Sequence, residues 1–177
     1  MAPLTASEWG EESASGASIA EIETVYRASF ARFLAVAAMI CRDADLGSEV
    51  VQEAFAQAIR SRRSFRRDAP LEAWIWRITV NAAQRAGRAR RPIPVSDVHD
   101  DASIWSPDDG GEAVREILAG LPERQRTVLF LRYCADLDYR AIGQVLDMRV
   151  GTVGATINAA LSTLRRRMTT SEVRSDV

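Results

Sequence analysis

Residues 138–167 read DYRAIGQVLDMRVGTVGATINAALSTLRRR, in which two stretches of helical spacing flank a short polar turn. Asp138 can cap a short helix over 139–146, and the turn at 147–149 leads into a longer helix that begins near Val150. That longer helix ends in three consecutive arginines. Two helices joined by about three residues, the second ending in positive charge, predict a DNA-binding helix-turn-helix, although such pairs also occur in all-α proteins with no nucleic-acid role.

The rest of the chain shows the apolar spacing of three and four residues that is typical of amphipathic helices. Pro70 and Pro122 each stand where the first turn of a helix tolerates proline. No useful length of sequence alternates between apolar and polar residues, so we expect an all-α fold. The apolar positions of the expected helices are Ile22, Val25, Tyr26, Phe33, Leu34, Ala37 and Ile40; Leu46, Val50, Val51, Phe55, Ala58 and Ile59; Leu71, Trp74, Ile75, Ile78 and Ala82; and Val128, Leu129, Leu131 and Tyr133.

The formal net charge of −1 conceals two basic segments separated by an acidic one. All 23 basic residues are arginine. Residues 21–91 carry a net charge of +5 and residues 113–170 carry +4, whereas residues 92–112 carry −6. Basic segments favour a polyanionic partner, although arginine-rich helices also occur as solvated faces. The acidic segment is rich in Pro, Gly and Asp, which predicts a flexible linker.

We therefore expect two small helical domains joined by a flexible acidic linker, with the helix-turn-helix in the second domain. The expected divisions are a disordered acidic tail over 1–19, a first domain over 20–91, the linker over 92–111, a second domain over 112–170 and a disordered tail over 171–177. Trp105 is unusual for a linker and predicts docking on one of the domains.

Several classes of function are excluded by the composition. A chain with 47% apolar and 27% charged residues is globular. The one histidine, His99, lies in the acidic segment, the acidic pairs lack a neighbouring base, and Gly110-Gly111 lacks the context of a phosphate-binding loop, so we expect no enzyme, metal or cofactor. No apolar run approaches the ~18–20 residues of a membrane span, and the acidic residues at the start of the sequence lead us to expect no secretory signal. Two distant cysteines in apolar stretches favour a reduced, cytoplasmic protein without membrane insertion.

Three motifs resemble those of a known family. LPERQRTVLFLRY at 121–133, followed by the helix-turn-helix, resembles the fourth conserved region of bacterial sigma factors. VVQEAF at 50–55 and AWIWRITVN at 73–81 resemble the second conserved region. Their order and spacing over about residues 20–168 are similar to the small extracytoplasmic-function (ECF) class. The resemblance implies a protein that binds core RNA polymerase, directs it to promoter DNA, helps to melt the −10 element and is held by an anti-sigma protein.

The resemblance also implies roles for particular residues. The helix that docks on the polymerase corresponds to the one bearing Val51, Gln52, Glu53 and Phe55, with Gln52 and Glu53 exposed. Capture of a melted strand needs apolar or aromatic pockets for the bases and arginine for the backbone. The residues expected at the −10 element are Arg62, Arg63, Phe65, Arg66, Arg67, Arg77, Asn81, Arg85 and Arg88. Phe65 is alternatively a core residue, and Asn81 a plain exposed position. Of the tryptophans, we expect Trp74 in the core and Trp76 more exposed.

The expected recognition helix departs from the family pattern, because no basic residue stands between Val150 and Arg165. The residues left for the −35 element are Arg149, Thr152, Thr156, Asn158, Arg165, Arg166 and Arg167. Duplex affinity rests mainly on neutralised phosphates, so we expect weak −35 binding. Two alternatives are a sigma-like decoy that binds a regulator without starting transcription, and a stand-alone repressor, which would have no use for a polymerase-docking helix.

Overall fold

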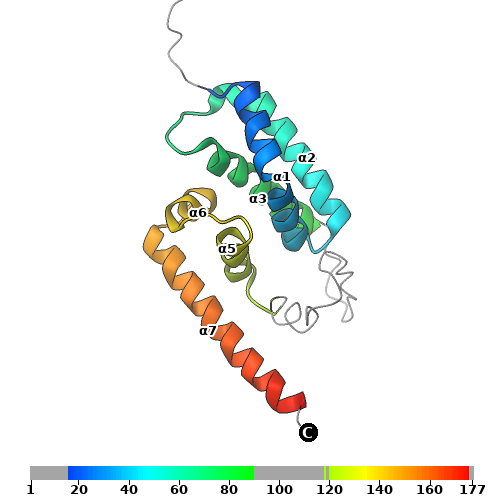
Figure 1. The fold of residues 1–177 in the computed structure, drawn as a ribbon, viewed down its shortest axis with the longest axis vertical. Coiled ribbons are helices and arrows are strands. Elements are labelled where there is room, and N and C mark those ends of the chain that lie inside the picture. The colour runs from blue at the N-terminus through cyan, green and yellow to red at the C-terminus, as the bar shows by residue number, and fades with distance from the viewer. Residues whose placement is uncertain (1–15, 90–117, 119, 176–177) are drawn as a thin grey trace, which may run out of the picture.

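The computed structural model describes residues 16–89, 118 and 120–175 (Figure 1). Over these residues the chain is helical and has no strand, which confirms the expected fold class. The elements are α1 (Ile19–Cys41), α2 (Ala44–Ser61), the short 3-10 helix η1 (Arg62–Ser64), α3 (Leu71–Ala89), α5 (Glu123–Tyr133), α6 (Tyr139–Leu146) and α7 (Val150–Ser175). The expected linker, with Trp105 and His99, lies outside the described residues, as do residues 1–15.

Helices α1, α2 and α3 pack on one another as a three-helix unit. Helix α1 begins with a capping box, in which the Ser18 hydroxyl accepts from the Glu21 N–H and the Glu21 carboxylate accepts from the Ser18 N–H. Asp43 caps α2 by accepting from the Leu46 N–H at 2.7 Å. Helices α1 and α2 approach each other so closely that a Cβ on Gly47 of α2 would lie 2.6 Å from the backbone of Ala38 in α1.

The core of this unit corrects the expectation for the two tryptophans. Trp76 is fully buried and stacks on Phe33, whereas Trp74 is partly exposed and lies beside Phe65. The expectation was wrong because the buried face of α3 runs through Ala73, Trp76, Val80 and Ala83. The expected apolar positions included neither alanine, so the stripe was drawn through Trp74 and the inward face of the helix was misplaced.

The ends of the helical units differ from the expected divisions. Gly16 and Ala17 already belong to the first unit, because their N–H groups donate to the carbonyls of Phe65 and Arg62 at 2.8 and 2.9 Å. At the other end, α7 continues to Ser175, past the boundary expected at residue 170. The division into two independent domains remains a prediction.

Helices α5, α6 and α7 form the second unit, and α6 and α7 are the helix-turn-helix expected from the sequence. Asp138 caps α6 by accepting from the Ala141 N–H at 2.7 Å. Asp147 ends α6 in the left-handed conformation with a φ of 52°. The turn folds back on α6, since a Cβ on Gly143 would lie 2.7 Å from the Met148 carbonyl oxygen.

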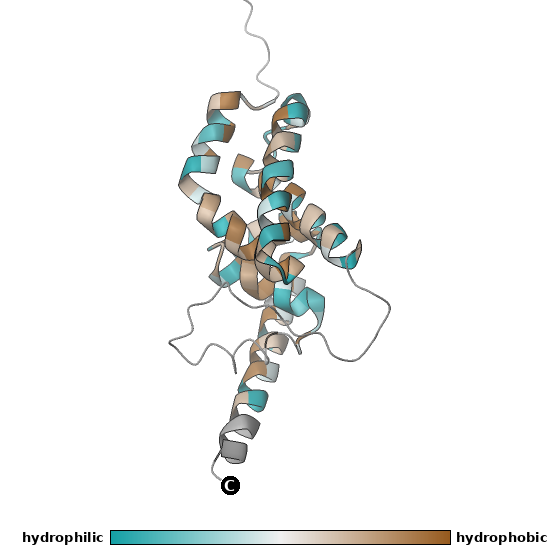
Figure 2. Ribbon diagram, turned by 90° about the vertical axis from the view of Figure 1, so that its right-hand side faces the viewer, coloured by the Kyte–Doolittle hydropathy of each residue, from teal (hydrophilic) through white to brown (hydrophobic). Residues whose placement is uncertain are grey.

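Helix α1 is longer and more apolar than the sequence analysis allowed. By length and composition alone it would suffice to cross a membrane, with a mean hydropathy of 1.3. Ile22, Phe33, Val36 and Ala37 are nevertheless buried against the rest of the unit, as expected for the core helix of a helical bundle. In Figure 2 the apolar residues gather where the helices meet, and α7 projects from the body of the molecule.

Candidate polymerase-binding and nucleic-acid surfaces

The VVQEAF helix presents two polar side chains to solvent. Gln52 and Glu53 of α2 are exposed, whereas Val51 and Phe55 are buried and hold the helix against α1. Glu53 pairs with Arg60 at 2.5 Å on the same helix. The two buried residues thus fix the position of α2, and the two polar ones face solvent.

Two exposed apolar residues, which the sequence analysis did not identify as a contact surface, lie on α1 and α2. Tyr26 of α1 is 39% exposed and packs edge-on against Phe55, with ring centroids 5.0 Å apart. Ile59 of α2 is 38% exposed. Both residues belong to the apolar stripes of their helices, so sequence periodicity placed them in the core and gave no sign of their exposure.

The loop after α2 holds its aromatic residue inward. Phe65 is only 3% exposed, and it lies 5.4 Å from Trp74 between ring centroids. Arg67 has a φ of 57° and pairs with Glu21 at 3.0 Å, while Arg63 and Arg66 are exposed. In this conformation the Phe65 ring is a core element, and the arginines around it form the accessible part of the loop.

Glu21 is the charged group that anchors this loop to the start of α1. Hydrogen bonds from the Ser18 backbone N–H and the Ser18 hydroxyl, followed by the bond from Arg67, lower the pKa of Glu21 below its ordinary value. The carboxylate therefore stays ionised at neutral pH and ties Arg67 in place.

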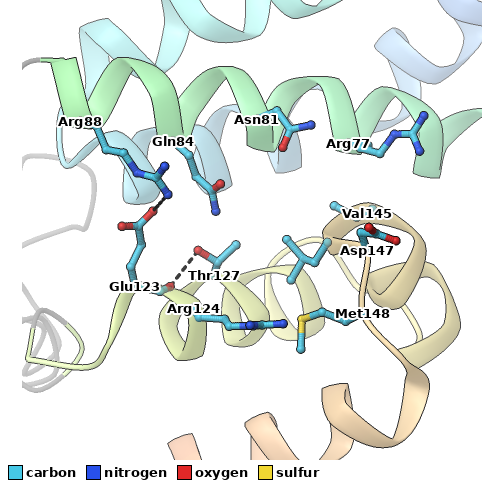
Figure 3. Close-up of a pocket in the computed structure, with 11 residues that line it drawn as sticks. Arg77, Asn81, Gln84, Arg88, Glu123, Arg124, Thr127, Val145, Asp147 and Met148 are labelled. Atoms are coloured by element: carbon cyan, nitrogen blue, oxygen red, sulfur yellow. Dashed lines mark hydrogen bonds and ion pairs between the residues drawn. The ribbon is translucent and has the colours of Figure 1, made fainter.

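Along α3, four polar residues at spacings of four, three and four share one face: Arg77, Asn81, Gln84 and Arg88. We call these four residues the α3 stripe. They line a cavity of about 390 Å³ between the two helical units (Figure 3). Arg85, by contrast, is exposed and does not line the cavity.

The opposite wall of the cavity comes from the second unit. It consists of Glu123, Arg124 and Thr127 from α5, with Val145, Leu146, Asp147 and Met148 from the end of α6 and its turn. Arg88 crosses the cavity to pair with Glu123 at 3.2 Å. Sequence reasoning found three members of the stripe but missed Gln84, although its spacing from Asn81 and Arg88 places it on the same face.

The expected recognition helix, α7, buries Val153, Ile157 and Ala160 and exposes Thr152 and Asn158. The Thr156 hydroxyl donates to the Thr152 carbonyl at 2.7 Å. Arg149 is exposed at the turn, and Arg165, Arg166 and Arg167 are exposed further along the helix, with the Arg167 guanidinium against Gly120. Between these two groups of arginines the exposed face carries no charge.

Comparisons with known proteins match two regions of the chain. Residues 25–93 match Sigma-70 region 2, and residues 111–164 match Sigma-70 region 4. The RNA polymerase sigma-H factor of Pseudomonas aeruginosa is 34% identical over 145 residues, covering 71% of this chain and 75% of that protein. The ECF RNA polymerase sigma-E factor of Escherichia coli K12 is 34% identical over 145 residues, covering 69% and 74%.

Two solved structures have a similar fold. The sigma factor RpoE from Bartonella quintana, in complex with the anti-sigma factor NepR, has a TM-score of 0.68 at 19% identity and covers 85% of this chain and 98% of that one. CnrH, in complex with the cytosolic domain of CnrY, has a TM-score of 0.68 at 21% identity, covering 84% and 88%.

The motifs, the two matched regions and the relatives together show that this chain belongs to the sigma-70 family of RNA polymerase sigma factors, in its ECF group. It is a sigma factor that binds core RNA polymerase and directs transcription initiation at particular promoters. The family is one of initiation factors rather than of catalysts.

Proposed function

We propose that three surfaces of this chain divide the work of initiation: the exposed face of α2 docks on core polymerase, the α3 stripe and the neighbouring loop hold the melted −10 strand, and α7 contacts the −35 duplex. The observation that carries this assignment is the α3 stripe. It combines two guanidinium groups for phosphates with amides that can read base edges, all on one helix face.

At the docking surface, Gln52 and Glu53 supply the polar contacts while Val51 and Phe55 position the helix. Reversing one charge and removing one amide, as in Gln52→Ala/Glu53→Arg, is expected to weaken the complex with core polymerase. Exposed substitutions usually change stability by about 0.5 kcal/mol or less, so the fold is retained. Glu23→Arg, an exposed reversal on α1, is the matched control. Equal polymerase affinity for all three proteins in a pull-down rules out this docking surface.

At the −10 element, the α3 stripe binds the strand together with Arg62, Arg63, Arg66, Arg67 and Arg85. Phe65 does not contact the strand, because its ring is buried; it packs beside Trp74 and holds the loop in place. Replacing Asn81 by Ala is expected to cost about 1–3 kcal/mol of base discrimination if the amide makes a bidentate contact. The test is binding of single-stranded −10 DNA by the polymerase complex, with Arg27→Ala on α1 as a control. Unchanged binding and unchanged sequence preference contradict this role.

The chain acts in the cytoplasm, where polymerase and promoters are, and leaves catalysis to the polymerase. An anti-sigma protein is its regulator, a partnership supported by the similar structure of the sigma factor RpoE, which was solved in complex with the anti-sigma factor NepR. A sigma-like decoy, which binds a regulator without starting transcription, is the second candidate and is favoured by the uncharged face of α7. Failure of the chain to start transcription with core polymerase distinguishes it.

A further inference from the structure

The loop after α2 is bonded to the residues that precede α1. The Gly16 N–H donates to the Phe65 carbonyl oxygen at 2.8 Å, and the Ala17 N–H donates to the Arg62 carbonyl oxygen at 2.9 Å. Gly16 has a φ of 104°, which glycine adopts without strain, and a Cβ there would lie 3.2 Å from the Arg62 carbonyl oxygen. Two backbone hydrogen bonds, made from a closely fitted segment, therefore hold this loop.

An ion pair joins the same two segments through their side chains. Nη2 of Arg67 donates to both oxygens of the Glu21 carboxylate, at 3.0 and 3.1 Å. This carboxylate is itself held, because its Oε2 accepts from the Ser18 N–H at 2.8 Å. Arg67 has a φ of 57°, a conformation that is costly for a residue with a side chain and persists where the surrounding contacts maintain it. We call residues 16–21 the strap.

We propose that the strap sets the shape of the loop that holds the melted −10 strand, and that Glu21 is a positioning residue that acts through Arg67. The proposal rests on the proposed function of the loop arginines. Both bonds to Glu21 come from one nitrogen of Arg67, whose side chain is 44% exposed, so the other N–H groups of the guanidinium can donate to a phosphate. Glu21 therefore holds this guanidinium in place and leaves donors for the strand.

The strap also fixes the backbone on which the neighbouring arginines stand. Arg63 and Arg66 are exposed and lie on either side of the buried Phe65. The two carbonyl groups that the strap bonds belong to the residues directly before these arginines. Donors that are already held in place bind more tightly, because less freedom is lost on binding. The strap lies outside residues 25–93, which match Sigma-70 region 2, so it is an addition to the matched region.

The test measures binding of short, labelled, random-sequence single-stranded DNA by the complex of the full chain with core polymerase, with core polymerase alone as background. Glu21→Gln removes the ion pair with Arg67 but keeps an oxygen for the Ser18 N–H, since glutamine also forms capping boxes. Glu23→Gln is the matched control, because it removes the same charge from α1 and breaks only the pair with Arg27. Hydrogen exchange measures the order of the loop, and circular dichroism checks the fold.

Charge alone and the strap predict opposite results for Glu21→Gln. Removing a carboxylate near the strand would tighten DNA binding, whereas releasing Arg67 and the loop would weaken it. Glu21→Gln is expected to bind up to about fivefold more weakly than the wild type, the factor that corresponds to loss of a partly exposed ion pair, and to exchange faster over residues 62–67. Glu23→Gln is expected to bind at least as tightly as the wild type.

A second variant disturbs the strap without changing its charge. Gly16→Ala places a side chain at a positive φ and against the Arg62 carbonyl oxygen, so it is expected to weaken DNA binding in the same direction as Glu21→Gln. This variant carries the test if Glu21→Gln fails to fold.

Arg67→Gln separates positioning by Glu21 from a merely structural role. If Glu21 acts through Arg67, adding Glu21→Gln to Arg67→Gln costs no further DNA affinity. Equal or tighter binding by Glu21→Gln, or additive losses in the double variant, overturns the role of Glu21. Arg63→Ala/Arg66→Ala tests the proposed function itself: if this variant binds single-stranded DNA as the wild type does, the −10 assignment of the loop is wrong.

Discussion

The indole of Trp76 stacks on the ring of Phe33 with centroids 3.8 Å apart and planes 19° apart. Phe33 also packs edge-on against Phe55 at 5.1 Å, so one aromatic contact series joins all three helices of the first unit. The buried Phe55 of α2, the helix that we propose docks on polymerase, is thereby connected to α3, which bears the α3 stripe. The relative placement of these two proposed surfaces depends on the three rings.

Replacing Trp76 by Ala is expected to lower the free energy of unfolding by about 3–5 kcal/mol, since it removes a fully buried ring and leaves a cavity. Trp74→Ala is the matched control, because Trp74 is partly exposed, and it is expected to cost less. Urea unfolding followed by circular dichroism measures both. Equal costs for the two variants contradict the placement of Trp76 in the core.

Gly143→Ala is expected to destabilise the helix-turn-helix by about 1–3 kcal/mol, although alanine is the better helix former. The added Cβ would lie 2.7 Å from the Met148 carbonyl oxygen, which belongs to the turn and cannot swing away like a flexible side chain. Gly154→Ala is the control, because its Cβ would meet only Tyr139 at an ordinary 3.5 Å. Thermal unfolding is expected to show a lower midpoint for the first variant only. A raised midpoint for Gly143→Ala argues against this tight turn.

Glu21 is expected to contribute a pH-dependent part of the stability. Its pKa is lower in the folded chain than its ordinary value of 4.5, so its contribution is fully present above that value and is lost as the pH falls through the folded pKa. Glu21→Gln is therefore expected to be less stable than the wild type at neutral pH, with the difference shrinking below 4.5. Urea titrations across the pH range measure this difference. A constant difference at all pH values contradicts the linkage.

The uncharged face of α7 predicts weak duplex binding with a shallow salt dependence. Ala155 is exposed on that face. Ala155→Arg is expected to raise duplex affinity at low salt and to steepen the slope of log affinity against log salt by about 0.9, the value of one further phosphate contact. Ala28→Arg, an exposed change on α1, controls for net charge. Fluorescence anisotropy over a salt series measures the slope for each variant. Equal slopes for Ala155→Arg and Ala28→Arg would show that α7 does not contact the phosphates.

The sequence predicted the parts of this structure that depend on local signals. Asp138 at the start of α6 and the turn at Asp147 were correctly placed, because capping and turn preferences act over three or four residues. Trp76 was misplaced because the buried face of α3 includes the small residues Ala73 and Ala83, which the expected apolar stripe left out. The contact of Arg32 with Ala135 spans 103 positions, and nothing local in the sequence marks either partner. For the same reason the cavity between the units could not be predicted, although three residues of the α3 stripe were.

Transcription by core polymerase supplemented with the purified chain tests the central claim most directly. The template is a pool of duplex DNA with randomised upstream sequence, and the transcripts are sequenced to recover the promoters used. The account predicts specific start sites that share a common upstream element, that require the chain, and that are lost with Gln52→Ala/Glu53→Arg. Stable binding of the chain to core polymerase with no transcript from any template would contradict the claim and identify the chain as a decoy.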